Sequence, residues 1–195
     1  STLLCLRSEG ELQAGDVAGG RAAAAYARIT QQAAPRGDLM RFLSAEEVAQ
    51  HQALAPFFAE LDAVVAELRG SALLQDEWAG PLLPLRRNEM QVTCYPGGGA
   101  RYVRHVDNNA NNGRRITCIL YANPDWQPGH GGELRLYARG GVVDVAPLLN
   151  RLIVFWSDSR VPHEVLPSHA ERFALSVWYE EARADTPATH GKEAV

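Results

Sequence analysis

The sequence contains very little lysine and cysteine, and it lacks any long apolar run. Lys192 is the only lysine, so arginine supplies nearly all of the positive charge, and the net charge is -4. A protein that binds nucleic acid through phosphates usually carries a basic face, so we expect no nucleic-acid partner. No segment approaches the ~18 apolar residues of a membrane-spanning helix, and the start does not resemble a signal peptide. We therefore expect no membrane partner.

The three cysteines, Cys5, Cys94 and Cys118, stand at unrelated spacings that suit neither a disulfide framework nor a cysteine-based zinc site. Reduced thiols are typical of a cytoplasmic or nuclear protein, and we expect this location. The chain opens abruptly at Ser1, so we expect it to begin inside a longer protein. Its 195 residues suffice for one domain with a ligand pocket. We predict this domain over residues 1–183 and a polar tail over 184–195.

The first third of the chain predicts a long connection followed by two helices. Residues 16–38 are small and loop-like, and residues 39–43 can form a short strand. Ser44 and Glu47 have the spacing of a capping box at a helix start. Pro56 interrupts the helical pattern. A second amphipathic helix follows and ends at Gly70; its predicted apolar face consists of Phe57, Leu61, Val64, Val65 and Leu68.

From Gly80 onward, short strand-like segments alternate with glycine, proline and asparagine clusters. Because the helices precede the strands, the pattern favours the α+β class over a doubly wound sheet. About eight antiparallel strands supported by N-terminal helices predict a sandwich or barrel such as a jelly roll. The expected strands cover residues 89–95, 101–106, 115–121, 133–138, 142–145, 151–156, 163–166 and 172–180.

Two potential metal ligands, His105 and Asp107, stand two residues apart, so an extended strand directs both to one face. They supply two members of the 2-His-1-carboxylate triad that binds Fe(II) and leaves positions open for substrate and dioxygen. The tripeptide alone is weak support, because a surface histidine beside a solvated aspartate has the same sequence. His163, at the start of a different strand, offers the third ligand.

The last strand carries an arginine that alternation directs inward. Phe173, Leu175 and Val177 suit packing against the helices, whereas Arg172 and Ser176 then face the barrel interior. A buried arginine is costly unless it meets an anion, and its planar fork suits a carboxylate. A zinc hydrolase could share the metal ligands but has no use for such an arginine.

These residues lie within phrases that resemble one family of enzymes. The phrases include Cys94-Tyr95-Pro96-Gly97, Tyr102-Val103-Arg104-His105-Val106-Asp107-Asn108, Phe155-Trp156-Ser157-Asp158, Pro162-His163-Glu164-Val165 and Val177-Trp178-Tyr179. From about Met90 to Tyr179 the chain resembles the Fe(II)- and 2-oxoglutarate-dependent prolyl 4-hydroxylases of the oxygen-sensing type, which act on hypoxia-inducible factor.

The resemblance implies a double-stranded β-helix with the metal near its open end. It implies that His105, Asp107 and His163 bind Fe(II), and that Arg172, with the Tyr121 hydroxyl, holds the distal carboxylate of 2-oxoglutarate. The other residues that it assigns to the co-substrate pocket are Tyr95, Ile119, Leu134, Ser176 and Trp178. Gln91 departs from the methionine of animal relatives. Ascorbate is the expected reductant.

Arg36, Asp38 and Arg114 match positions that organise the substrate entrance in this family, although a surface ion-pair network is an equal alternative. The resemblance implies a monomeric enzyme that uses dioxygen and 2-oxoglutarate to hydroxylate a proline in a protein, giving succinate and CO2, with a rate that could report oxygen. Relatives act on hypoxia-inducible factor, on a Skp-type ubiquitin-ligase adaptor or on elongation factor Tu. The alternatives are a 2-oxoglutarate oxygenase for another residue, a nucleobase or a small molecule, and a non-catalytic jelly roll that binds a partner.

Overall fold

The computed structural model describes residues 7–15, 36–71, 84–108 and 112–181. Most of the expected connection at 16–38 and the whole tail at 184–195 therefore lie outside the described residues. Within the described residues, no helix is long and apolar enough to cross a membrane.

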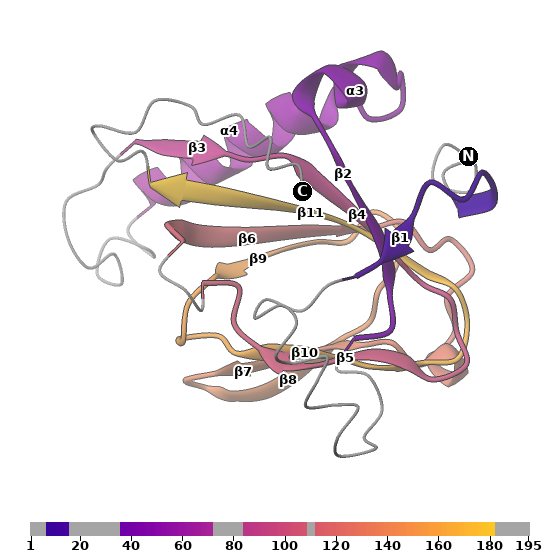
Figure 1. Ribbon diagram of the computed structural model, residues 1–195. Helices are drawn as coiled ribbons and strands as arrows, with labels where there is room; N and C mark the ends of the chain where they lie inside the picture. The colour runs from indigo at the N-terminus through magenta and orange to yellow at the C-terminus, as the bar shows by residue number, and fades with distance from the viewer. Residues whose placement is uncertain (1–6, 16–35, 72–83, 109–111, 182–195) are drawn as a thin grey trace, which may run out of the picture.

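Two antiparallel sheets face each other, and two helices lie on the outer side of the larger one (Figure 1). The larger sheet has the strand order β1-β2-β4-β11-β6-β9, with β3 paired to β11, and the smaller sheet has the order β5-β10-β7-β8. In chain order the elements are β1 (Gln13–Ala14), β2 (Leu39–Leu43), α3 (Ala45–Gln50), α4 (Phe57–Gly70), β3 (Leu85–Arg87), β4 (Met90–Tyr95), β5 (Ala100–His105), β6 (Arg114–Tyr121), the short 3-10 helix η1 (Pro128–His130), β7 (Leu134–Ala138), β8 (Gly141–Val145), β9 (Leu152–Trp156), β10 (His163–Ser168) and β11 (Arg172–Glu181).

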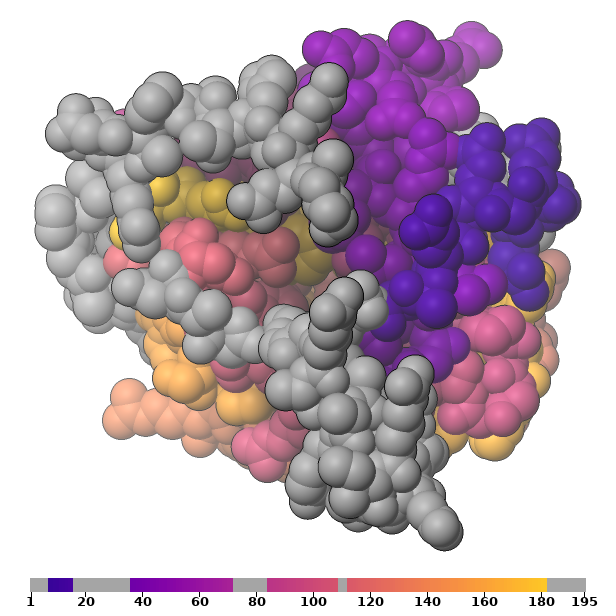
Figure 2. All heavy atoms as spheres, in the orientation of Figure 1, coloured from indigo at the N-terminus to yellow at the C-terminus, as the bar shows by residue number. Residues whose placement is uncertain are grey.

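This arrangement is the double-stranded β-helix that the sequence predicts. The eight expected strands all form, with ends that differ from the prediction by at most two residues. β1 and β3 were not predicted, because segments of two and three residues carry too little alternation to detect. The space-filling view shows β1 (indigo) against β2 (purple) on one flank of the molecule (Figure 2).

The helices begin and end where the local sequence dictates. Ser44 accepts a hydrogen bond from the Glu47 backbone N–H, and the Glu47 side chain accepts one from the Ser44 N–H, so the predicted capping box is confirmed. One prediction on α4 was wrong: Val64 is 37% exposed, and the buried face consists of Phe58, Leu61 and Val65. Each of these buried side chains contributes roughly 1.5–3 kcal/mol to folding.

Strand β11 separates the hydrophobic core from a cavity. Tyr179, on the face with Phe173, Leu175 and Val177, donates a hydrogen bond of 2.6 Å from its hydroxyl to Asp62 of α4. The opposite face, which carries Arg172 and Ser176, lines the cavity between the two sheets. The predicted orientation of the strand is therefore confirmed, and the arginine lies inside the barrel.

Candidate active site

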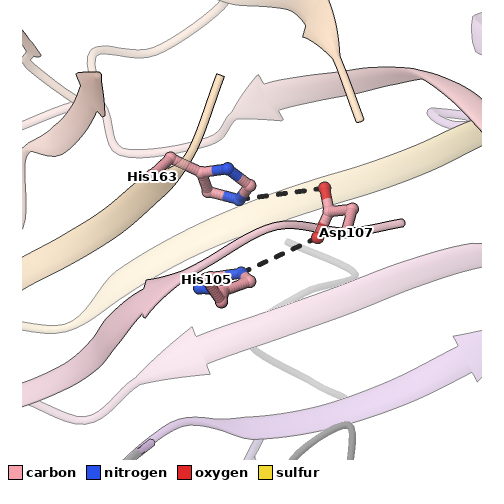
Figure 3. A group of neighbouring side chains, drawn as sticks. All are labelled: His105, Asp107 and His163. Atoms are coloured by element: carbon pink, nitrogen blue, oxygen red, sulfur yellow. Dashed lines mark ion pairs between the residues drawn. The ribbon is translucent and has the colours of Figure 1, made fainter. Parts of the chain in front are cut away.

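The side chains of three potential metal ligands, His105, Asp107 and His163, point toward one another (Figure 3). His105 ends β5, Asp107 follows two residues later and His163 begins β10. His105 Nε2 lies 3.7 Å from Asp107 Oδ1, and His163 Nε2 lies 3.8 Å from Asp107 Oδ2. One ligand atom from each residue lies within 4.8 Å of the others, so a single ion could contact all three.

Hydrogen bonds to the backbone prepare both imidazoles for a metal. The Nδ1 atom of His105 lies 2.8 Å from the Val103 carbonyl oxygen, and that of His163 lies 3.2 Å from the Val161 carbonyl oxygen. A carbonyl can only accept, so each Nδ1 carries the proton and each Nε2 offers its lone pair. Burial, with the neighbouring His163, lowers the pKa of His105 to about 4, and a neutral ring suits metal binding.

The carboxylate of Asp107 is held in its ionised form. Burial alone would raise its pKa, but the adjacent His163 and His105 and the hydrogen bonds to the carboxylate outweigh burial, and the net pKa is lowered. Thr117 donates a hydrogen bond of 2.7 Å to Asp107 Oδ2. The donor set therefore fits a divalent metal ion: two neutral imidazole nitrogens and one carboxylate.

Tyr102 adds a ring contact that sequence alternation did not predict. The register of β10 against β5 pairs His163 with His105 and Val165 with Tyr102. The paired residues are two positions apart on β10 but three apart on β5, so β5 contains one extra residue, a β-bulge. This bulge directs Tyr102 and His105 to the same side, where their rings stack with centroids 3.8 Å apart.

The cavity beside these ligands has a volume of about 270 Å³. It is bounded by polar and apolar side chains from both sheets. All of the pocket residues predicted from the sequence except Tyr121 line it, namely Tyr95, Ile119, Leu134, Arg172, Ser176 and Trp178. Gln91 also lines it, and its amide nitrogen lies 3.1 Å from the sulfur of Met40.

Arg172 is one of three arginines that line this cavity, with Arg36 and Arg114. It is 2% exposed, and its Nε donates a hydrogen bond of 2.6 Å to the Gly132 carbonyl. Its Cζ lies 5.0 Å from the ring centroid of Tyr95 and 4.9 Å from that of Tyr121. In the described part of the chain, no carboxylate makes an ion pair with Arg172.

The Tyr121 hydroxyl next to this guanidinium is a second free donor. It is fully buried, and its proton finds no acceptor among the residues that the structure describes, because the adjacent Arg172 can only donate. Burial raises the pKa of Tyr121, although the charge of Arg172 opposes the increase, so the hydroxyl keeps its proton. A buried donor without a partner is costly. A ligand carboxylate that accepts from Tyr121 and pairs with Arg172 would satisfy both groups.

Two of the predicted entrance residues, Arg36 and Arg114, line the same cavity, and the third, Asp38, forms a buried pair with Arg36. Arg36 and Asp38 are joined by an ion pair of 2.5 Å, with side chains that are 8% and 0% exposed. The alternative of a surface ion pair is therefore wrong for these two residues. Arg36 also lies over the Tyr102 ring, at 4.5 Å from its centroid, and Arg114 lies 4.0 Å from the centroid of the Trp178 ring.

A jelly roll with a 2-His-1-carboxylate cluster and a buried arginine in one cavity defines the class of the non-haem iron oxygenases. Comparison with known proteins agrees: the family model of the 2OG-Fe(II) oxygenase superfamily matches residues 90–180. The chain is 39% identical to human prolyl hydroxylase EGLN3 over 180 residues. This match covers 91% of this chain and 70% of the human protein. The match to the mouse protein of that name is shorter, with 54% identity over 99 residues and 41% of its length.

Two solved structures share the fold over nearly the whole chain. One is a prolyl hydroxylase from Trichoplax adhaerens in complex with a peptide of hypoxia-inducible factor, with a TM-score of 0.70, 30% identity, and coverage of 92% of this chain and 74% of that one. The other is a prolyl-4-hydroxylase from Pseudomonas putida, with a TM-score of 0.71, 29% identity, and coverage of 93% and 83%. The chain belongs to the prolyl hydroxylases of the 2OG-Fe(II) oxygenase superfamily, a family that implies Fe(II) and 2-oxoglutarate.

Proposed function

We propose that this protein is a peptidyl-proline 4-dioxygenase in which His105, Asp107 and His163 hold Fe(II). The observation that carries the proposal is the shared cavity: three metal ligands and the buried Arg172 line one space of about 270 Å³. Pockets that hold small ligands begin at roughly this size. The bound iron would supply the activation of dioxygen that is coupled to oxidative decarboxylation of 2-oxoglutarate.

The residues of the chain position the reactants. Arg172 and Tyr121 receive the distal carboxylate of 2-oxoglutarate, because both donors lie side by side and lack an anionic partner among the described residues. The ring of Tyr95 covers the guanidinium from another side. The apolar walls, Ile119, Leu134 and Trp178, exclude water from the carbon chain of the co-substrate, and Ser176 adds a hydroxyl to the same cavity.

A protein segment carrying the target proline would enter past Arg36 and Arg114, which both line the cavity. Asp38 anchors Arg36 in this position through their buried ion pair. The substrate belongs to one of three classes: a hypoxia-inducible transcription factor, a Skp-type ubiquitin-ligase adaptor or elongation factor Tu. The Trichoplax relative was solved with a peptide of the first class.

We further propose that the enzyme is a monomer in the cytoplasm and uses ascorbate as reductant. Its rate would depend on the concentration of dioxygen. The two described cysteines, Cys94 and Cys118, are free and buried, which suits a reducing compartment. If oxygen sensing is correct, turnover rises with dioxygen throughout the range below air saturation. A rate already saturated at low dioxygen would contradict a sensing role.

Two experiments test the proposal. His163→Ala and Asp107→Ala each remove one metal ligand, and we expect both to abolish 2-oxoglutarate turnover; near-normal turnover in either would refute the metal site. Mass spectrometry after incubation of each candidate substrate with enzyme, Fe(II), ascorbate and 2-oxoglutarate identifies the substrate class. A mass increase of one oxygen atom on a proline is expected for one class, and modification of none would refute all three.

A further inference from the structure

Two buried hydroxyl groups, those of Thr117 and Ser157, lie next to the carboxylate of Asp107. Thr117 of β6 lies 2.7 Å from Asp107 Oδ2, and its hydroxyl oxygen lies 2.8 Å from that of Ser157, which directly follows β9. Thr117 is 1% exposed and Ser157 is 0% exposed. A hydroxyl in such surroundings must find its partners within the protein.

The chemistry of the groups fixes the direction of both hydrogen bonds. An ionised carboxylate can only accept, so Thr117 donates its single hydroxyl proton to Asp107. Thr117 then has no proton left for Ser157, and Ser157 must be the donor in the contact between them. The three groups form a chain in which Ser157 donates to Thr117 and Thr117 donates to Asp107. Hydrogen bonds in such a chain polarise and strengthen one another.

Ser157 also holds the backbone next to the ligand. Its carbonyl oxygen accepts a hydrogen bond of 2.8 Å from the N–H of Asn108, the residue after Asp107. Its own N–H donates to the Arg115 carbonyl at 3.0 Å. This support matters because Asp107 lies beyond the end of β5 and receives no support from strand pairing. Ser157 therefore acts on the ligand through both its side chain and its backbone.

We propose that Thr117 and Ser157 are positioning residues that fix the orientation of the Asp107 carboxylate before the metal binds. With Oδ2 held by Thr117, rotation of the carboxylate is restricted, and the entropy lost on metal binding is reduced. Groups that orient a metal ligand in this way typically change metal affinity by about 10–100-fold when they are removed. The inference rests on the proposed role of Asp107 as a ligand.

The test measures the affinity of the metal-free protein for Mn(II) alone by isothermal titration calorimetry. Thr117→Val keeps the branched shape but removes the donor, and we expect about 10–100-fold weaker binding. Thr117→Ser retains the hydroxyl and should restore affinity close to that of the wild type. Ser157→Ala removes only the outer donor and keeps the backbone contacts, so we expect a smaller loss of about 2–10-fold.

A double-mutant cycle separates a relay from two independent packing effects. If Ser157 acts through the hydroxyl of Thr117, Ser157→Ala loses its effect on Mn(II) affinity in the Thr117→Val background. Full additivity, or wild-type affinity of Thr117→Val, would overturn the proposal. Thermal unfolding of the metal-free variants checks that each of them folds. If Thr117→Val does not fold, the single variants Thr117→Ser and Ser157→Ala still test the proposal, because near wild-type affinity is expected for the first and a loss of affinity for the second.

Two further variants separate failure of the relay from failure of the metal site. Asp107→Ala must abolish Mn(II) binding; if it binds normally, the proposed function itself is wrong. Ser168→Ala is a matched control, because Ser168 is a buried serine whose hydroxyl donates to a backbone carbonyl, that of Ala170, at 2.8 Å. We expect it to leave Mn(II) affinity unchanged, and a loss equal to that of Ser157→Ala would contradict the relay.

Discussion

Replacing Arg172 by lysine tests the co-substrate site, because it keeps the charge and removes the planar fork. In the protein, Arg172 uses Nε for the Gly132 carbonyl and leaves the rest of its guanidinium toward the cavity. Lysine has a single ammonium group that cannot bind a carboxylate through two parallel hydrogen bonds. Loss of one hydrogen bond to a charged group costs about 1.5–3 kcal/mol. This corresponds to a roughly 10–100-fold weaker affinity for 2-oxoglutarate.

The assay is the thermal unfolding of the Mn(II)-loaded protein with and without 2-oxoglutarate. At a concentration about 100 times the wild-type Kd, the co-substrate stabilises the wild type by ~2.7 kcal/mol. For a chain of this size that raises Tm by about 5–11 °C. A 10–100-fold loss of affinity reduces the shift in Arg172→Lys to roughly 0.15–0.5 of the wild-type value.

Arg135→Lys provides the control. Arg135 also binds a carboxylate, that of Asp144, with two hydrogen bonds of 2.8 Å, but it is not part of the cavity lining. Its replacement should leave the 2-oxoglutarate shift intact. An equal shift in Arg172→Lys and the wild type would refute the assignment of Arg172 to the distal carboxylate.

Three smaller changes probe neighbouring features. Tyr121→Phe removes a buried hydroxyl whose proton has no acceptor in the described structure. We therefore expect the free protein to be as stable as the wild type, or more stable by up to about 1–3 kcal/mol, and the KM for 2-oxoglutarate to rise by about 2–10-fold; a clear loss of stability without a KM change would contradict this role. Asp38→Asn removes the carboxylate charge that pairs with Arg36 and should destabilise the protein by about 1.5–3 kcal/mol in urea unfolding, whereas a neutral result would contradict the role of this pair. Ser44→Ala removes the helix cap, with an expected loss of about 0.5–2 kcal/mol by the same assay.

The sequence predicted the strands well because this fold leaves a local signature. Alternation and turn residues located all eight strands of the double-stranded β-helix, since each strand has one face toward the core or cavity. The buried face of α4 was predicted less accurately. The sequence predicted that Val64 is buried, whereas in the structure Val64 is exposed and Phe58 is buried. The choice between them depends on the sheet and cannot be made from the helix alone.

The cluster of candidate metal ligands could be predicted because its members are few, chemically distinct and partly tied to a short spacing. The groups that hold them could not. Thr117 and Ser157 reach Asp107 only because β6 and β9 are neighbours in the sheet. The stacking of Tyr102 on His105 depends on a bulge. Only the contacts that orient the imidazoles are local in sequence. Each histidine forms a hydrogen bond with the backbone carbonyl of the residue two positions before it, Val103 for His105 and Val161 for His163.

The most direct test of the central claim follows the oxygen atoms of the reaction. The enzyme is incubated with Fe(II), 2-oxoglutarate, isotopically heavy dioxygen and the substrate that the survey of three protein classes identifies. Mass spectrometry then locates the label. A peptidyl-proline dioxygenase places one heavy atom in hydroxyproline and the other in succinate, with neither product formed by Asp107→Ala. Succinate without any oxidised proline, or hydroxyproline whose oxygen comes from water, would contradict the account.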